Sequence, residues 1–393
     1  MPIPALSYSS YDLINGSILN AGGFSNITEF YETLFADTFA NAKWTSIFDK
    51  AEGSIGEDYS QIKSARGIPV MASYVAFDGE APKIANEGIA ISAGTMPRMK
   101  LGFDTNEKAL REQLKIANIY QGKPAYDRIY EKFVKNNFDL VNGIHAQINY
   151  TAFQIESTGK FTTSLLNNPA GVQPLAFNFS IPAANKKKAG GFGSKGTKNA
   201  WSSSSANPIG DLQDMVKWAE DNFIPVGVFR MNNATWTALR DHVNTVKLVA
   251  IKVTGGGIDS ANLANYPVTD SEIMRYLEGL GLPPIEVVDD LSAVQVYDPE
   301  KRQMVKKYLR GFADDTVVLR PAGSIGSYQW SYPTPDFATA TDPMFMLDGG
   351  MIGLSKFVSP KEKKMEFVAE CTGIPVLEAP DYMILLDTAH AAS

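Results

Sequence analysis

Cysteine and histidine are almost absent from this sequence of 393 residues. The only cysteine is Cys371, so the chain can form no internal disulfide and no cysteine-rich zinc cluster. The histidines His145, His242 and His390 lie far apart and show no metal-ligand spacing. We therefore predict no metal site, and we expect each histidine to be buried or solvated without a ligand.

Basic residues are missing from the N-terminal end, since residues 1–40 contain neither lysine nor arginine. A secretory signal needs a basic start followed by an apolar run, and this segment has neither. No apolar stretch anywhere approaches the ~20 residues that a membrane-spanning helix needs. We therefore expect a soluble protein without a membrane partner, made in a cytoplasm.

Signatures of catalysis and of cofactor binding are also missing. There is no Gly-x-Ser-x-Gly elbow and no His-Glu-x-x-His motif, so we predict no catalytic residue. Gly191–Gly196 has the glycine spacing of a dinucleotide-binding loop, but Trp201 and residues 202–205 separate it from the next expected helix. A flexible loop is the preferred interpretation, no cofactor is predicted, and a Rossmann-type oxidoreductase is a distant alternative.

The charge that is present is mostly acidic, with 36 Lys and Arg against 43 Asp and Glu and a net charge of −7. Affinity for nucleic-acid phosphates comes mainly from Lys and Arg, so the balance argues against a protein that reads nucleic-acid sequence. Hydrophobic residues make up 44%, which is enough for a sizeable core. The length allows two or three domains, or one elaborated fold.

The first hundred residues predict extended structure. Residues 1–66 have the pattern of an arm, with a helical patch over Ile27–Phe48. Residues 67–103 predict an exposed hairpin, because Asp78-Gly79 is a turn signal and prolines disfavour a central strand.

A long helix and an α+β unit are expected next. Apolar residues at three- and four-residue spacing predict one helix over 124–157, roughly 50 Å long. A loop over 182–207 follows later, and its composition predicts mobility or a partner-facing surface. Helices and strands then alternate over 208–330, so the predicted fold class is α+β. The expected helices begin at Pro208, at Ala234 and at Thr269, where Thr269 and Glu272 form a capping box. The expected strands are Pro225–Arg230, Ile285–Val288, Ala293–Tyr297 and Thr316–Arg320, and in the tail two strands separated by Gly373-Ile374-Pro375 within residues 365–387.

Four sets of short strings follow one another through residues 67–388. They are Ile68–Leu101 with the long helix to Phe153; Gly196-Thr197, Trp201-Ser202 and Asn207-Pro208 with Asp211 and Asp214; Val228-Phe229, Trp236-x-x-Leu239-Arg240 and Val246-Lys247; and Asp315–Leu319, Gly323–Gly326, Pro375–Leu377 and Pro380-Asp381. In this order they resemble the major capsid proteins of lambda-type tailed phages, which adopt the Hong Kong 97 capsid fold.

This resemblance implies a division of the chain. It gives an N-terminal arm (1–66), an extended loop (67–103), a peripheral domain with a spine helix (104–207), an axial domain (208–355) and strands returning to the peripheral domain (356–393). It also implies a structural protein whose copies form the hexamers and pentamers of an icosahedral shell around double-stranded DNA. Portal, scaffolding and decoration proteins would be partners, the DNA would be held without sequence specificity, and the location would be the virion, after assembly in the cytoplasm of a bacterial host.

The extended loop supplies the expected contacts between copies. Its charged residues are of both signs, and we expect intersubunit ion pairs from Glu80, Lys83, Glu87, Arg98 and Lys100. Each exposed pair would contribute only ~0–1 kcal/mol, so assembly would depend on many weak contacts together.

Two other structural roles stay open from the sequence. An encapsulin-type cellular nanocompartment shares the fold and would bind cargo-enzyme tails in place of a genome. A phage tail-tube protein is less favoured, because such a protein would be mostly strands and this chain predicts a long helix.

Overall fold

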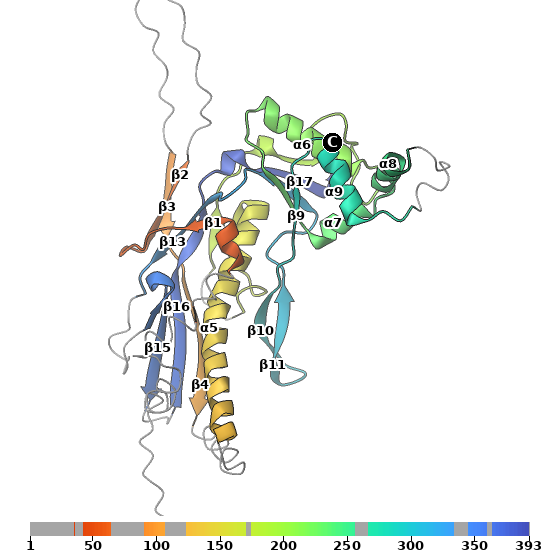
Figure 1. The fold of residues 1–393 in the computed structure, drawn as a ribbon. Helices are drawn as coiled ribbons and strands as arrows, with labels where there is room; N and C mark the ends of the chain where they lie inside the picture. The colour runs from red at the N-terminus through yellow and green to blue at the C-terminus, as the bar shows by residue number, and fades with distance from the viewer. Residues whose placement is uncertain are drawn as a thin grey trace, which may run out of the picture.

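The computed structural model describes Phe35 and residues 42–63, 90–106, 123–169, 174–255, 266–333, 345–359 and 364–392. Helices and several separate sheets confirm the expected α+β class. One unit is a sheet packed along a long helix, and the other is a second sheet covered by shorter helices at one end of that helix (Figure 1). Each unit has its own cluster of buried hydrophobic side chains.

The long helix α5 (Lys123–Thr158) has 36 residues and is about 54 Å long. It confirms the single helix predicted over 124–157. Its buried face repeats at helical spacing, with Leu140, Val141, Ile144 and Ile148 all buried. Gly143, which weakens a helix, faces Leu101 of a neighbouring strand, and a Cβ at this position would collide with the Leu101 side chain.

A six-stranded sheet packs against α5. Its path is β1 (Phe48–Lys50), β13 (Gly326–Ser331), β16 (Lys364–Leu377), β15 (Ile352–Ser359) and β14 (Phe345–Leu347), and β4 (Arg98–Asn106) also pairs with β16. Short 3₁₀ turns accompany it at η1 (Lys43–Ser46), η4 (Asp348–Gly350) and η5 (Pro380–Tyr382).

The root of the arm belongs to this core. Trp44 in η1 is fully buried, and so is Phe48 in β1. The helical patch predicted over 27–48 lies mostly outside the described residues, but its last part is a 3₁₀ turn and a strand. The reason is that β1 pairs in parallel with β13, and this tertiary pairing overrides the local helical spacing.

The tail strand also differs from its prediction. Gly373-Ile374-Pro375 was expected to separate two strands, but β16 runs through them as one strand. The strand pairs with β4 up to Thr372. From Thr372 to Leu377 its paired strand, among the described residues, is β13. Proline, which has no N–H to donate, can therefore occupy position 375. On the side of β16 where β4 has ended, no paired strand among the described residues needs that donor.

A five-stranded sheet forms the second unit, with the order β7 (Lys186–Ala189), β17 (Ile384–Ala391), β12 (Thr316–Arg320), β8 (Val228–Asn232) and β9 (Ile285–Val288). Its helices are α6 (Pro208–Asp221), α7 (Asn233–Arg240), α8 (Val243–Thr254) and α9 (Asp270–Gly279). The capping box of Thr269 and Glu272 is confirmed at α9. The helix expected from Ala234 is found as α7, but its expected continuation through Val243 and Val246 is wrong, since α7 ends at Arg240 and His242 caps a new helix.

The two units interleave along the sequence. β17 was assigned to strands that return to the peripheral domain, but it lies between β7 and β12 in the five-stranded sheet. Conversely, β13 and β14 fall in the range assigned to the axial domain but belong to the six-stranded sheet. The physical reason is that strand pairing, which is not local in sequence, decides to which unit each segment belongs.

Two antiparallel hairpins project from these units (Figure 1). One pairs β2 (Asp58–Lys63) with β3 (Ala90–Thr95), so its strands begin before residue 67, and β4 joins the large sheet. The other pairs β10 (Ser292–Asp298) with β11 (Gln303–Leu309) and runs beside α5. A short pair, β5 (Lys160–Thr162) with β6 (Ala176–Asn178), and the turn η2 (Ala183–Asn185) complete the described elements.

Candidate assembly surfaces

Of the five predicted contact residues, the structure describes Arg98 and Lys100; Glu80, Lys83 and Glu87 lie outside the described residues. Both cations are on β4 and both face Glu370 on β16. The nitrogens lie 2.6 Å (Arg98 Nη2) and 3.2 Å (Lys100 Nζ) from Glu370 Oε2. The Glu370 side chain is 5% exposed, whereas those of Arg98 and Lys100 are 43% and 45% exposed. The two cations therefore neutralise a buried carboxylate of their own chain and still present charge at the surface.

The first hairpin is fixed to the body at its base. The Gln61 side chain donates to the Leu377 carbonyl at 2.7 Å. Ser60 exchanges two hydrogen bonds with the Gln329 side chain, at 2.9 and 2.8 Å. These bonds set the direction in which β2 and β3 leave the body.

The second hairpin leaves apolar side chains in solvent. Tyr297 and Met304 are opposite each other in register and are 58% and 56% exposed. Tyr308, on the same face, is 63% exposed. An isolated two-stranded hairpin is marginal in water, so this exposure points to a surface that a partner covers.

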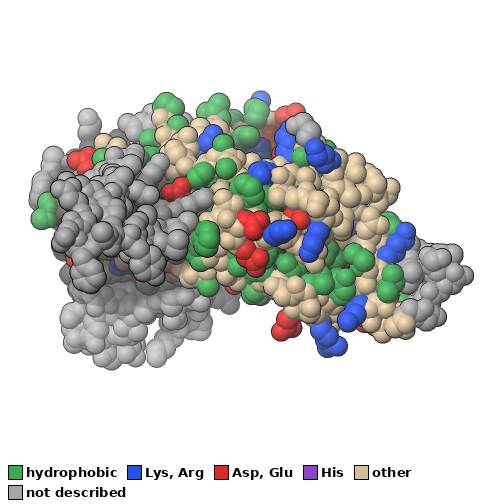
Figure 2. All heavy atoms as spheres, turned by 90° about the horizontal axis from the view of Figure 1, so that it is seen from above, with side chains coloured by type: hydrophobic (Ala, Val, Ile, Leu, Met, Phe, Trp, Pro, Cys, Tyr) green, Lys and Arg blue, Asp and Glu red, His purple; other side chains and the backbone are tan. Residues whose placement is uncertain are grey.

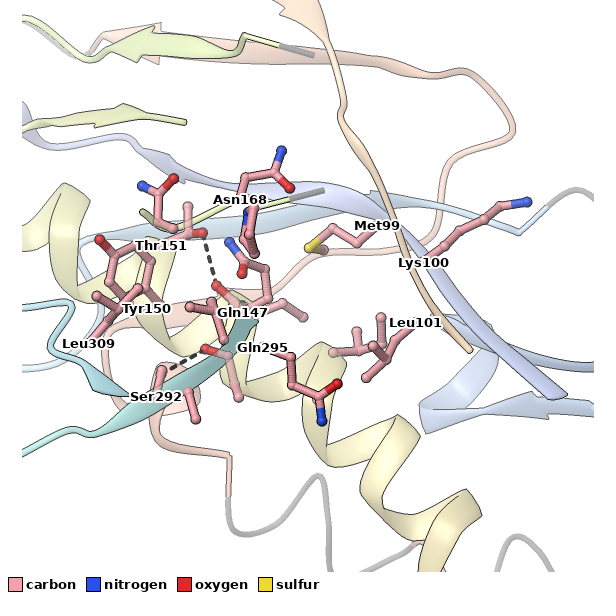
Figure 3. A pocket seen from close by; sticks show the side chains of 18 of the residues that line it. Met99, Lys100, Leu101, Gln147, Tyr150, Thr151, Asn168, Ser292, Gln295 and Leu309 are labelled. Carbon is pink, nitrogen blue, oxygen red and sulfur yellow. Dashed lines mark hydrogen bonds between the residues drawn. The ribbon is translucent and has the colours of Figure 1, made fainter. Parts of the chain in front are cut away.

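A groove of about 1490 Å³ separates this hairpin from β4, and α5 forms its floor. Tyr297, Met304 and Lys306 line it from the hairpin, and Leu101 lines it from β4. Figure 3 shows Leu101 and Gln295 extending from their strands toward the space over α5. Ser292 Oγ lies 3.3 Å from the Ala146 carbonyl and fixes the start of the hairpin to the helix.

A buried charge cluster joins the two units. Glu156, near the C-terminal end of α5, is fully buried, and its Oε1 lies 2.8 Å from the Nε atoms of both Arg230 (β8) and Arg320 (β12). Arg230 Nη1 also lies 2.6 Å from Glu286 on β9. Burial raises the pKa of Glu156, and the two guanidinium groups act in the opposite direction. Sequence reasoning missed this cluster, because no motif or spacing relates position 156 to positions 230 and 320.

A second buried polar group involves His145. Its Nδ1 accepts a hydrogen bond from Trp44 Nε1 at 3.3 Å, and its Nε2 lies 2.9 Å from Asp348 Oδ2. The indole N–H only donates, so Nδ1 is the acceptor and Nε2 carries the proton that faces Asp348. The histidine therefore links the arm, α5 and η4.

The thiol of the single cysteine is not accessible to solvent. Cys371 is fully buried, with the Tyr328 hydroxyl 3.3 Å from its sulfur, and burial raises the pKa of the thiol to about 12. It is protonated at neutral pH and is no nucleophile. Across the described ranges, no group of three or more His, Cys, Asp or Glu side chains could hold a metal ion.

Backbone amides of the glycine-rich loop donate hydrogen bonds to carboxylates of α6 in the same chain. Asp214 Oδ2 accepts from the amides of Lys195 and Gly196 at 2.8 Å each. Asp211 accepts from the Gly190 amide and from Trp201 Nε1, also at 2.8 Å. A bound phosphate would need these amides free, so the loop geometry lends no support to a dinucleotide site here. The range 182–207 is not all loop, since it contains η2 and β7, and these hydrogen bonds hold its glycine-rich part against α6.

The surface charge is mixed. On the face seen from above, acidic and basic side chains of the described residues are interspersed with hydrophobic ones (Figure 2). Such a face provides no extended field of one sign. None of the helices that the structure describes has the length and apolar character needed to cross a membrane.

Comparisons with known proteins find likeness in structure only. No family model and no curated protein matches the sequence. The putative capsid protein of a prophage of E. coli CFT073 is 15% identical, with a TM-score of 0.48, over 90% of this chain and 97% of that chain. A phage-related protein from Bordetella bronchiseptica RB50 is 12% identical, with a TM-score of 0.44, over 91% and 96%. The SrpI encapsulin of Synechococcus elongatus PCC 7942 is 8% identical, with a TM-score of 0.35, over 86% and 84%.

Proposed function

We propose that this chain is a shell-forming subunit, the major capsid protein of a tailed phage. Its copies form hexamers and pentamers that close into an icosahedral shell around double-stranded DNA, with portal, scaffolding and decoration proteins as further partners. It is assembled in the host cytoplasm and resides in the virion. The role is structural and not catalytic.

One observation carries the proposal: the arrangement of the elements along the chain. A buried arm root, a hairpin leaving the body, a helix of 36 residues across a six-stranded sheet and a five-stranded unit at the end of that helix occur in this order. This is the order that the sequence resemblance to the Hong Kong 97 capsid fold implies. The long helix also disfavours a tail-tube protein, which would be mostly strands.

The surfaces support the same role. Both hairpins are two-stranded, and such hairpins need further packing to be stable. Contacts of this kind between many identical copies are weak one by one and strong together. The buried polar groups around Glu156 and His145 are internal, so they are available to stiffen the subunit and not to bind a substrate.

The experiment is expression of the full chain alone, followed by size-exclusion chromatography with light scattering and negative-stain electron microscopy. Rings of five or six subunits, or closed polyhedral particles, are the expected result. A chain that stays monomeric up to high concentration, with no ring or particle in the micrographs, contradicts the proposal.

A further inference from the structure

A bend between β1 and β2 holds one isoleucine in solvent. Ile55 is 96% exposed. The backbone on either side of it is fixed: Ser54 N–H donates to the Trp330 carbonyl at 3.0 Å, and Met96 N–H donates to the Glu57 carbonyl at 2.6 Å. Ile55 is therefore presented by an anchored bend, and burying it against a partner would cost little ordering of the backbone.

The same bend is acidic. Residues 52–58 contain the carboxylates Glu52, Glu57 and Asp58 and no basic residue. All three are exposed, and none of them enters an ion pair with another described residue. A complementary partner surface would combine an apolar contact for Ile55 with positive charge.

The groove beside α5 has both properties. Tyr297 and Met304 provide exposed apolar surface, and Lys306 stands on the same face of the hairpin, opposite Gln295 in register. Lys306 is exposed and has no ion pair within the described part of the chain. Across the groove, Leu101 is 43% exposed and extends toward the space over α5, whereas the side chain of Lys100 points away from it (Figure 3). The positive charge for the bend therefore comes from Lys306 on the hairpin.

The two surfaces lie on opposite sides of α5 in the view of Figure 1. A contact between them therefore joins two copies, with the bend of one copy in the groove of the next. Such a head-to-tail contact uses different surfaces on each copy, and it closes into a ring when the rotation per copy fits.

We infer that the acidic bend Glu52–Asp58 of one copy docks into the α5 groove of a second copy. Ile55 enters between Tyr297 and Met304, and Glu57 pairs with Lys306. This inference rests on the proposed function and names one contact within the assembly.

Cysteine crosslinking of the full chain tests the contact. The variant Ile55→Cys/Met304→Cys is assembled, oxidised and run on a non-reducing gel, where a ladder of crosslinked multimers is expected. The buried Cys371, protonated at neutral pH, does not compete. The matched control, Ile55→Cys/Phe223→Cys, uses a residue that is 69% exposed outside the groove and is expected to give no ladder.

Charge reversal gives a second readout. Glu57→Lys and Lys306→Glu should each raise the protein concentration needed for half-assembly about tenfold, and the combined variant should restore it. Particles that form without the crosslinked ladder, or single reversals without effect, overturn this contact and leave the proposed function standing. A wild-type chain that remains monomeric overturns both.

Discussion

The region around α5 buries charged side chains, whereas the β10–β11 hairpin leaves apolar side chains exposed. In the body, the Glu156 carboxylate is fully buried and lies between two arginines. On the hairpin, Lys306 is exposed, and large apolar side chains such as Tyr297 and Met304 stand in solvent. The difference indicates that the residues that stabilise the subunit are distinct from those that contact neighbouring copies. A substitution in one set should therefore change either stability or assembly, but not both.

The largest expected loss of stability comes from the arm root. Trp44→Ala should lower the free energy of unfolding by about 5 kcal/mol, because it empties a fully buried site and removes the indole N–H donor to His145. Urea unfolding followed by circular dichroism measures this. Asp49→Ala, at an exposed side chain of β1, is the control and should change little. A small effect of Trp44→Ala would mean that the arm is not part of the core.

The junction between the units comes next. Glu156→Gln should cost about 3 kcal/mol, because two buried guanidinium groups lose their shared counter-charge. Glu286→Gln is a matched control: it removes a partner of the same Arg230 from a side chain that is 56% exposed, and it should cost under ~1 kcal/mol. Equal effects in the two variants would refute a special role for the buried carboxylate.

The contact between the glycine-rich loop and Asp211 of α6 predicts how stability depends on pH. Burial raises the pKa of Asp211 to about 6, so between its unfolded pKa near 4 and pH 6 the folded state holds a proton that the unfolded chain has lost. This contribution is fully present below pH 4 and is lost as the pH rises through 6. Asp211→Asn cannot titrate, so its stability relative to wild type should rise by up to roughly 3 kcal/mol between pH 4 and pH 7.

Thermal unfolding at several pH values checks this slope. Asp211→Ser, which also cannot titrate, should show the same slope relative to wild type with a different offset. A constant difference from wild type for both variants would show that this carboxyl does not titrate in that window.

The smallest change in stability is expected at β4. Arg98→Gln/Lys100→Gln should lower the free energy of unfolding by about 1–2 kcal/mol, because the two cations are nearly half exposed but the buried Glu370 loses both counter-charges. If they also serve a neighbour, as the sequence predicts, assembly should weaken while the monomer stays folded. Replacement by glutamate is a poorer test, since three carboxylates would then meet around Glu370. Normal assembly of the glutamine variant would remove these two residues from the set of lattice contacts.

Local patterns predicted the elements well where the signal is periodic or capped. The helix over 124–157, the cap of Thr269 and Glu272, and the strands at 285–288 and 316–320 are all found in place. The break at His242 and the uninterrupted β16 were missed. There the outcome depends on a local cap and on the pairing of β16 with β13, and neither is visible in hydrophobic spacing.

The candidate surfaces were less predictable than the elements. Charge alone singled out Arg98 and Lys100, but not the buried Glu370 that they face in the same chain. Exposure of Ile55 and the positions of Tyr297 and Met304 around a groove depend on tertiary packing. A sequence gives no information on such exposure, since apolar residues in strands are more often buried.

The most direct test of self-assembly is the particle mass of the purified full chain as a function of its concentration, measured by analytical ultracentrifugation. The account predicts a sharp transition from monomers or capsomers to one discrete large species above a threshold concentration, as expected for cooperative closure of a shell. A single sedimenting species of about 42.8 kDa over the whole concentration range would contradict it.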